Sequence, residues 1–132
     1  MTTTTKVNHA LQNAKGHIES MVEDFKKDQL LQESNDYNQQ DELRESILNN
    51  ALSVEFRSGW STNFEKLEAE EFKILLTWGG PALQIIGGLD DYGPVNPKMQ
   101  YQDWGTPWTD FEITESQQDA LNWFCNCFYF GG

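Results

Sequence analysis

Pairs of acidic residues are the groups of this chain that come closest, in type and spacing, to a catalytic or metal-binding arrangement. The pairs are Glu70-Glu71, Asp90-Asp91, and Asp103 with Asp110. Paired carboxylates can transfer protons or hold a divalent cation. The chain has 21 acidic residues, however, so such pairs also arise by chance. We interpret Asp90-Asp91-Tyr92-Gly93 as a hairpin turn, because these residue types favour turns.

Histidine and cysteine do not complete a catalytic or metal-binding set either. His9 and His17 lie in a predicted helix, and neither is followed four residues later by a histidine or a glutamate. Cys125 and Cys127 would point about 200° apart on a helix, which favours two reduced, buried thiols over a disulfide. The chain contains no G-x-S-x-G, P-loop or G-x-G-x-x-G motif. We therefore expect a protein that is not an enzyme and that holds no metal and no cofactor.

The distribution of charge is more informative than these pairs. The formal net charge is −12, with only 9 lysines and arginines, and none of them follows Lys98. A charge of this size disfavours direct binding to nucleic acid and to anionic membranes. It favours attraction to basic surfaces, including the nucleic-acid channels of other proteins.

The part of the chain after Lys98 combines acids with tryptophans, and we expect it to bind a partner protein. In such a surface, carboxylates replace phosphates and indoles supply contact area. An alternative is that the tryptophans close the edge of the core while the acids only solvate it. The candidate partner-binding residues are Asp103, Trp104, Trp108, Asp110, Glu112, Glu115 and Asp119.

A second functional hypothesis uses the tryptophans as a pocket. Loops carrying Trp60, Trp104 and Trp108 could hold a small ligand, because aromatic rings bind cations and sugars. Asp103 or Asp90 would then supply a carboxylate for binding or catalysis. This hypothesis requires the three loops to converge on one concave site.

The N-terminal third shows helical periodicity. Apolar residues recur at spacings of three and four, which predicts a helix from about Val7 to Gln32. The stripe could pack on the protein's own core, giving a monomer, or on a second copy, giving a homodimer through the Val7–Phe25 helix. The stripe consists of Val7, Leu11, Ala14, Ile18, Met21 and Phe25.

The middle of the chain predicts a second helix and then a sheet. Polar residues Glu33–Gln40 form a connector, and Asp41–Ala51 has helical spacing. Four segments then read as strands joined by short turns, and short turns favour an antiparallel meander. We expect Trp78, in the second strand, to lie on the core face. We expect Gly105–Phe111 to be a loop. The strands are Leu52–Arg57, Phe72–Trp78, Ala82–Leu89 as the central strand, and Lys98–Trp104.

The C-terminal segment predicts a third helix. Thr114 followed by Gln117 matches a capping box, and apolar residues then recur on one face from Glu115 to Phe128. We expect an α+β fold with two N-terminal helices, a four-stranded antiparallel sheet and a C-terminal helix packed on the sheet. A chain of 132 residues is expected to form a single domain, with a helical part at 1–51 and the sheet with its helix at 52–132.

The sequence also bears on location. No apolar run approaches the ~20 residues needed to span a bilayer, and the N-terminal segment has no continuous apolar stretch of the kind found in signal peptides. We therefore expect no membrane contact and a cytoplasmic location.

Four segments, LSVEFRSGW, EFKILLTWGGPALQIIGGLDDYG, YQDWGTPWT and CFYFG, are similar to small acidic proteins carried by phages and mobile elements. The resemblance spans about Leu52 to Gly131. Proteins of this kind are often inhibitors of host defence, including anti-CRISPR and anti-restriction proteins. Together with the charge of −12, this class favours a non-enzymatic DNA mimic in the host cytoplasm that blocks nucleic-acid access to a basic nucleic-acid-binding complex, such as a Cas effector. The resemblance implies no catalytic residues.

Overall fold

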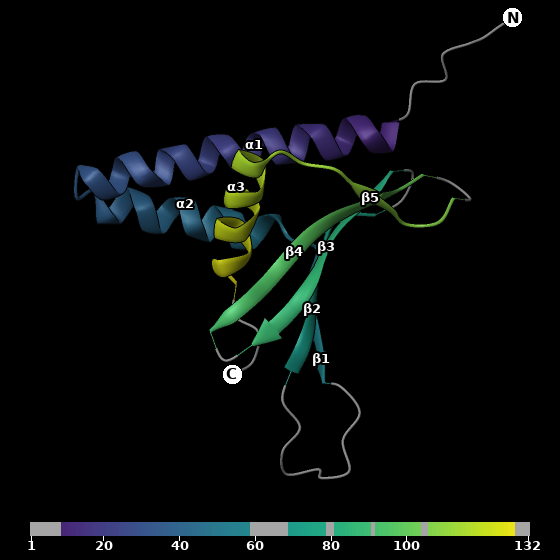
Figure 1. Ribbon diagram of the computed structural model, residues 1–132. Helices are drawn as coiled ribbons and strands as arrows, with labels where there is room; N and C mark the ends of the chain where they lie inside the picture. The colour runs from purple at the N-terminus through teal and green to yellow at the C-terminus, as the bar shows by residue number, and fades with distance from the viewer. Residues whose placement is uncertain (1–8, 59–68, 79–80, 91, 104–105, 129–132) are drawn as a thin grey trace, which may run out of the picture.

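The computed structural model describes residues 9–58, 69–78, 81–90, 92–103 and 106–128. These residues form three helices and one antiparallel sheet with strand order β1-β2-β3-β4-β5. The helices lie on one side of the sheet (Figure 1). The expected α+β fold with a meander sheet is therefore confirmed, but the sheet has five strands instead of four.

Helix α1 (His9–Glu33) is the long N-terminal helix that the spacing predicts. Ala10, Ala14, Ile18 and Met21 are buried along one side of it. The apolar stripe therefore packs into the protein's own core. Val7 lies outside the described residues.

Helix α2 (Tyr37–Asn50) begins four residues before the expected start at Asp41. The Asp36 side chain accepts a hydrogen bond from the Gln39 N–H at 3.2 Å and caps the helix. The connector shrinks to residues 34–36, in which Asn35 has a φ of 59°. The prediction of a connector over Glu33–Gln40 was wrong. Its last four residues form the first turn of α2, and this polar turn shows no apolar periodicity from which a helix could be predicted.

The strands are β1 (Ser53–Ser58), β2 (Ala69–Thr77), β3 (Ala82–Asp90), β4 (Gly93–Gln102) and β5 (Thr109–Phe111). Strand β5 lies within the segment expected to be a loop, and it pairs Met99 with Phe111 and Tyr101 with Thr109. A strand of three residues is too short to show an alternating pattern. The central position expected for β3 is confirmed.

The core lies between the helices and one face of the sheet. Opposed residues of neighbouring antiparallel strands point to the same face, so Ile74, Ile85 and Met99 form one row, and all are buried. This row belongs to the same core cluster as Ile18 of α1 and Leu121 of α3. No helix of the described residues covers the opposite face, which we call the open face.

Irregularities in β2 and β3 explain one wrong expectation. The register of β2 shifts between Leu75 and Thr77, and β2 ends at Thr77. Trp78 consequently lies beyond the strand and is 70% exposed, whereas we expected it on the core face. A second register shift lies between Ile86 and Gly88, at the glycine pair of β3.

Helix α3 (Glu115–Asn126) begins with the predicted capping box. The Gln117 N–H donates to Thr114 Oγ1, and Gln117 Oε1 accepts from the Thr114 N–H at 2.9 Å. Buried residues on α3 face both α1 and the sheet. Among the described residues no helix is long and apolar enough to cross a membrane.

Candidate functional site

Asp103, just after β4, is tied to Thr106 by hydrogen bonds across a turn. Thr106 closes this turn, because the Asp103 N–H donates to Thr106 Oγ1 at 3.0 Å and the Thr106 N–H donates back to the Asp103 carbonyl at 3.2 Å. Asp103 and Trp108 are both half-buried. Trp104 and Trp60 lie outside the described residues, so the expected tryptophan pocket is not described.

Asp110 of β5 lies on the open face of the sheet. Gln84 donates to Gln100 at 2.8 Å, and Gln100 donates to Asp110 Oδ1 at 2.7 Å, so a chain of side chains crosses three strands. Lys98 Nζ lies 3.5 Å from Asp110 Oδ2. The hydrogen bond from Gln100 and the positive charge of Lys98 lower the pKa of Asp110. This acid is therefore already partnered within the protein.

Two other acids of the candidate surface, Glu115 and Asp119, lie on the side of the helices. Glu112 follows β5, and Glu115 and Asp119 lie one turn apart on α3; all three are exposed. Helix α3 packs on the face that carries Met99, whereas Asp110 shares the opposite face with Gln100. The structure therefore divides the expected surface between two faces of the sheet. Within the described residues, none of the three acids forms an ion pair.

The open face carries charges of both signs. Arg57 donates two hydrogen bonds to Glu71, at 3.0 and 3.2 Å, and this interaction raises the pKa of Arg57. Lys73 lies in the adjacent cross-strand row, opposite Glu55 and Ile86. A depression of about 330 Å³ over this part of the sheet is lined by Glu55, Phe56, Arg57, Glu71, Phe72, Lys73, Gln84 and Ile86.

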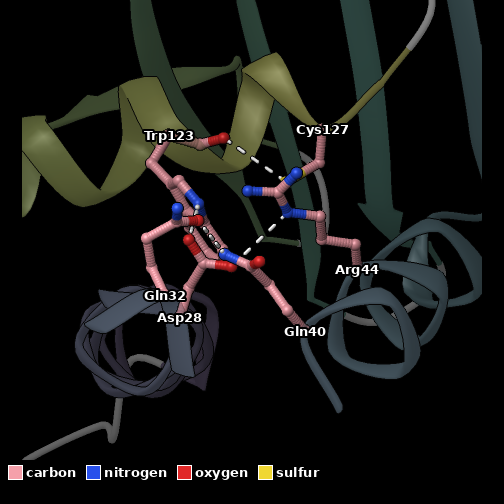
Figure 2. A network of polar contacts seen from close by, with 6 residues as sticks. All are labelled: Asp28, Gln32, Gln40, Arg44, Trp123 and Cys127. Carbon is pink, nitrogen blue, oxygen red and sulfur yellow. Dashed lines mark hydrogen bonds and ion pairs between the residues drawn. The ribbon is translucent and has the colours of Figure 1, made fainter. Parts of the chain in front are cut away.

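A polar cluster around the buried Asp28 and Gln40 joins the three helices, and the expectations from sequence did not include it (Figure 2). The Trp123 indole N–H donates to Asp28 Oδ2 at 3.2 Å. Asp28 Oδ1 accepts no hydrogen bond, but it lies 3.4 Å from Nε of Arg44, a residue of α2. Beside this pair, Gln40 donates to Gln32 at 2.9 Å.

The sequence carries a signal for this cluster. Asp28 continues the spacing of the buried stripe, three residues after Phe25 and seven after Met21. A side chain in such a position is buried when this face of the helix packs on the core. A buried carboxylate needs a hydrogen-bond donor or a cation beside it. The indole of Trp123 supplies the donor, and its ring also lies 5.6 Å from the ring of Phe25. We therefore assign Asp28 and Trp123 a structural role, which is to hold α1 and α3 together.

The two cysteine thiols near the C-terminus have little nucleophilic character. Cys125 lies in α3, and Cys127 follows the helix. Cys125 is fully buried, and burial raises its pKa. Burial also raises the pKa of Cys127 to about 11, and its thiol donates to the Trp123 carbonyl at 3.5 Å. A thiol with a raised pKa is protonated at neutral pH, and the thiolate is the reactive form.

The candidate acids assemble into no metal site within the described residues. Among them, no group of three His, Cys, Asp or Glu side chains could hold a metal ion. Asp90 accepts a hydrogen bond from the Tyr92 N–H at 2.8 Å within the expected hairpin turn, which is confirmed. Asp103 lies at the other end of β4, roughly 30 Å away by the rise of a strand. These two acids therefore do not meet in one site.

Comparison with protein-family models, with curated proteins and with solved structures finds no match to this chain.

Proposed function

We propose that this protein is a non-enzymatic inhibitor that binds a basic, nucleic-acid-binding protein of a bacterial defence complex, such as a CRISPR effector. The observation that carries the proposal is the charge of −12 together with the absence of any lysine or arginine after Lys98. The defence class rests on the resemblance to small acidic proteins of phages and mobile elements.

The exposed acids of α3, with Glu112 between β5 and α3, supply the binding surface in this proposal. Glu112, Glu115 and Asp119 are exposed, and α3 contains no base that could neutralise them. Asp110 contributes less, because Lys98 and Gln100 already occupy its carboxylate.

Helix α2 adds to the acidity of the helical side. Asp41, Glu42 and Glu45 are exposed on it, and its one base, Arg44, lies against the buried carboxylate of Asp28. Helix α3 therefore presents its carboxylates without a base of its own, and α2 sets three exposed acids against one half-exposed arginine. Carboxylates arranged in this way can occupy a basic groove that otherwise binds phosphates, which excludes the nucleic acid.

The electrostatic origin of the binding makes it dependent on salt. Exposed charges are screened over a Debye length of about 8 Å at physiological ionic strength. We expect affinity for the partner to fall as salt rises, as it does for the nucleic acid that the protein replaces. The resulting inhibition is competitive with nucleic acid and requires no turnover.

The experiment is capture of a partner from a bacterial host lysate with the tagged protein, followed by binding measurements on the purified partner. Reversal of Glu112, Glu115 and Asp119 to lysine is expected to weaken binding about tenfold or more, because unpaired charges are costly at an interface. The matched control reverses Glu19, Glu23 and Glu33 of α1, which are also exposed and give the same change in net charge. Equal loss in both variants, or capture only of proteins that do not bind nucleic acid, contradicts the proposal.

A further inference from the structure

We propose that the edge strand β1 pairs with β1 of a second copy and forms an antiparallel homodimer with one continuous sheet. The proposal does not depend on the proposed function. Strand β1 is at the end of the strand order and pairs only with β2 among the described residues. Within the described part of the chain, its outer edge therefore presents unpaired backbone N–H and C=O groups, which are a template for another strand.

The apolar side chains of β1 favour a protein partner over solvent. Leu52, just before the strand, is 62% exposed, and Phe56 within it is 50% exposed. Both lie on the face that the helices cover further along the sheet, because Phe56 is opposite the buried Phe72. In Figure 1 the helices lie nearest β4 and the edge with β1 extends away from them. The edge strand thus carries an uncovered apolar stripe.

The geometry of antiparallel pairing restricts the possible registers. In an edge strand, every second residue directs its N–H and C=O outward, and outward residues pair only with outward residues of the second copy. The two residue numbers in each opposed pair are therefore both odd or both even, and their sum, which is the same for every pair in a two-fold dimer, is even. The centre of the interface then falls on a residue of β1, with Val54, Glu55, Phe56 and Arg57 as the candidates.

Charge complementarity selects Phe56 as the centre. With Phe56 opposite Phe56 of the second copy, Glu55 faces Arg57 of the other strand, and the two-fold axis repeats this pair. A centre at Glu55 opposes two carboxylates, and a centre at Arg57 opposes two guanidinium groups; like charges directly opposite each other are destabilising. A centre at Val54 pairs a shorter part of the strand.

The selected register also suits the apolar stripe. The two Phe56 rings meet at the axis, and paired aromatic residues across strands stabilise a sheet. Arg57 remains close to Glu71 of its own chain, whose carboxylate already lies 3.0 Å from it. Glu71, Arg57 and Glu55 of the second copy thus form one alternating row of charges. Because β1 has only 6 residues, we expect the interface to bury less than the ~1,200 Å² at which stable complexes begin, and the dimer to be weak and dependent on concentration.

The test is a set of single-cysteine variants, analysed by oxidation and non-reducing electrophoresis. Phe56→Cys is expected to form a disulfide-linked dimer, because Cα atoms of directly opposed residues lie within about 5.5 Å. Glu55→Cys and Val54→Cys are expected to remain monomeric, since residues off the axis lie farther from their equivalents. The unaltered protein controls for Cys125 and Cys127. Faster cross-linking at residue 54 or 55, or no cross-linking at any of the three, overturns the proposal.

Self-association without cross-linking supplies the second measurement. Sedimentation velocity over a range of concentrations is expected to show reversible dimerisation of the unaltered protein. Glu55→Lys should weaken it about tenfold, because it opposes Arg57 with a like charge twice in the symmetric pair. Glu19→Lys, which makes the same charge change on α1, should leave it unchanged. A monomer at all concentrations, or equal effects of the two variants, contradicts pairing through β1.

Discussion

The indole N–H of Trp123 donates to the Asp28 carboxylate at 3.2 Å, although 95 residues separate the two in the chain. This hydrogen bond ties the C-terminal helix to the N-terminal one at a point where Asp28 is only 6% exposed. Arg44 brings the second helix to the same carboxylate. The acidic helical side of the protein therefore depends on a buried acid whose role is structural.

Removal of this carboxylate is expected to destabilise the fold. Asp28→Ala leaves the Trp123 N–H without its acceptor and should lower the free energy of unfolding by about 2–4 kcal/mol. Arg44→Ala should cost less, about 1–2 kcal/mol, because loss of this 48% exposed side chain lets water reach the Asp28 carboxylate. Urea denaturation of both variants measures the difference. An Asp28→Ala variant as stable as Arg44→Ala would show that the indole hydrogen bond contributes little.

Two glycines are expected to respond to alanine in opposite directions. A Cβ atom on Gly87 would lie 2.7 Å from the ring of the buried Phe72, so Gly87→Ala should destabilise the protein by about 1–3 kcal/mol. A Cβ on Gly16, within α1, meets nothing within 4 Å, and Gly16→Ala should stabilise the helix by about 0.5–1 kcal/mol. Thermal denaturation of both variants tests this, and a shift of the same sign in both would contradict the assigned packing.

The protonation of Asp110 is expected to depend on Gln100. The amide of Gln100 donates to this carboxylate, and together with Lys98 it lowers the pKa of Asp110 below the usual 3.8. Because the folded pKa is depressed, the associated stability is present above the unfolded pKa and is lost as pH falls through the folded one. A titration of the carboxyl followed by NMR should show the Asp110 pKa rising in Gln100→Leu. An unchanged pKa in that variant would argue against the row of hydrogen-bonded side chains Gln84, Gln100 and Asp110 across the open face.

Long periodic segments and specific turn chemistry could be predicted from the sequence. The stripe through Ala14 and Ile18 predicted α1, and Thr114 with Gln117 predicted the start of α3, because helical spacing and capping are local properties. The hairpin between Asp90 and Gly93 was predictable for the same reason.

The missed features depend on contacts between distant segments or on irregular pairing. The register shift in β2 moves Trp78 out of the alternating pattern, and no local signal marks that shift. Strand β5 exists because Thr109 and Phe111 find partners on β4. The acid of Asp28 is acceptable in the core only because Trp123 and Arg44 meet it there, and neither is near it in sequence. For the same reason, the sequence showed the acids of the candidate surface but not their division between two faces.

The most direct test of the proposed inhibition is a competition measurement with the captured partner. The protein is titrated into the complex of that partner with a fluorescently labelled nucleic acid, and release is followed by anisotropy at about 50 and 200 mM salt. We predict complete displacement of the nucleic acid at the lower salt. We also predict weaker displacement by the variant with Glu112, Glu115 and Asp119 reversed than by the one with Glu19, Glu23 and Glu33 reversed. A stable ternary complex, in which partner, nucleic acid and inhibitor remain bound together, would contradict the account.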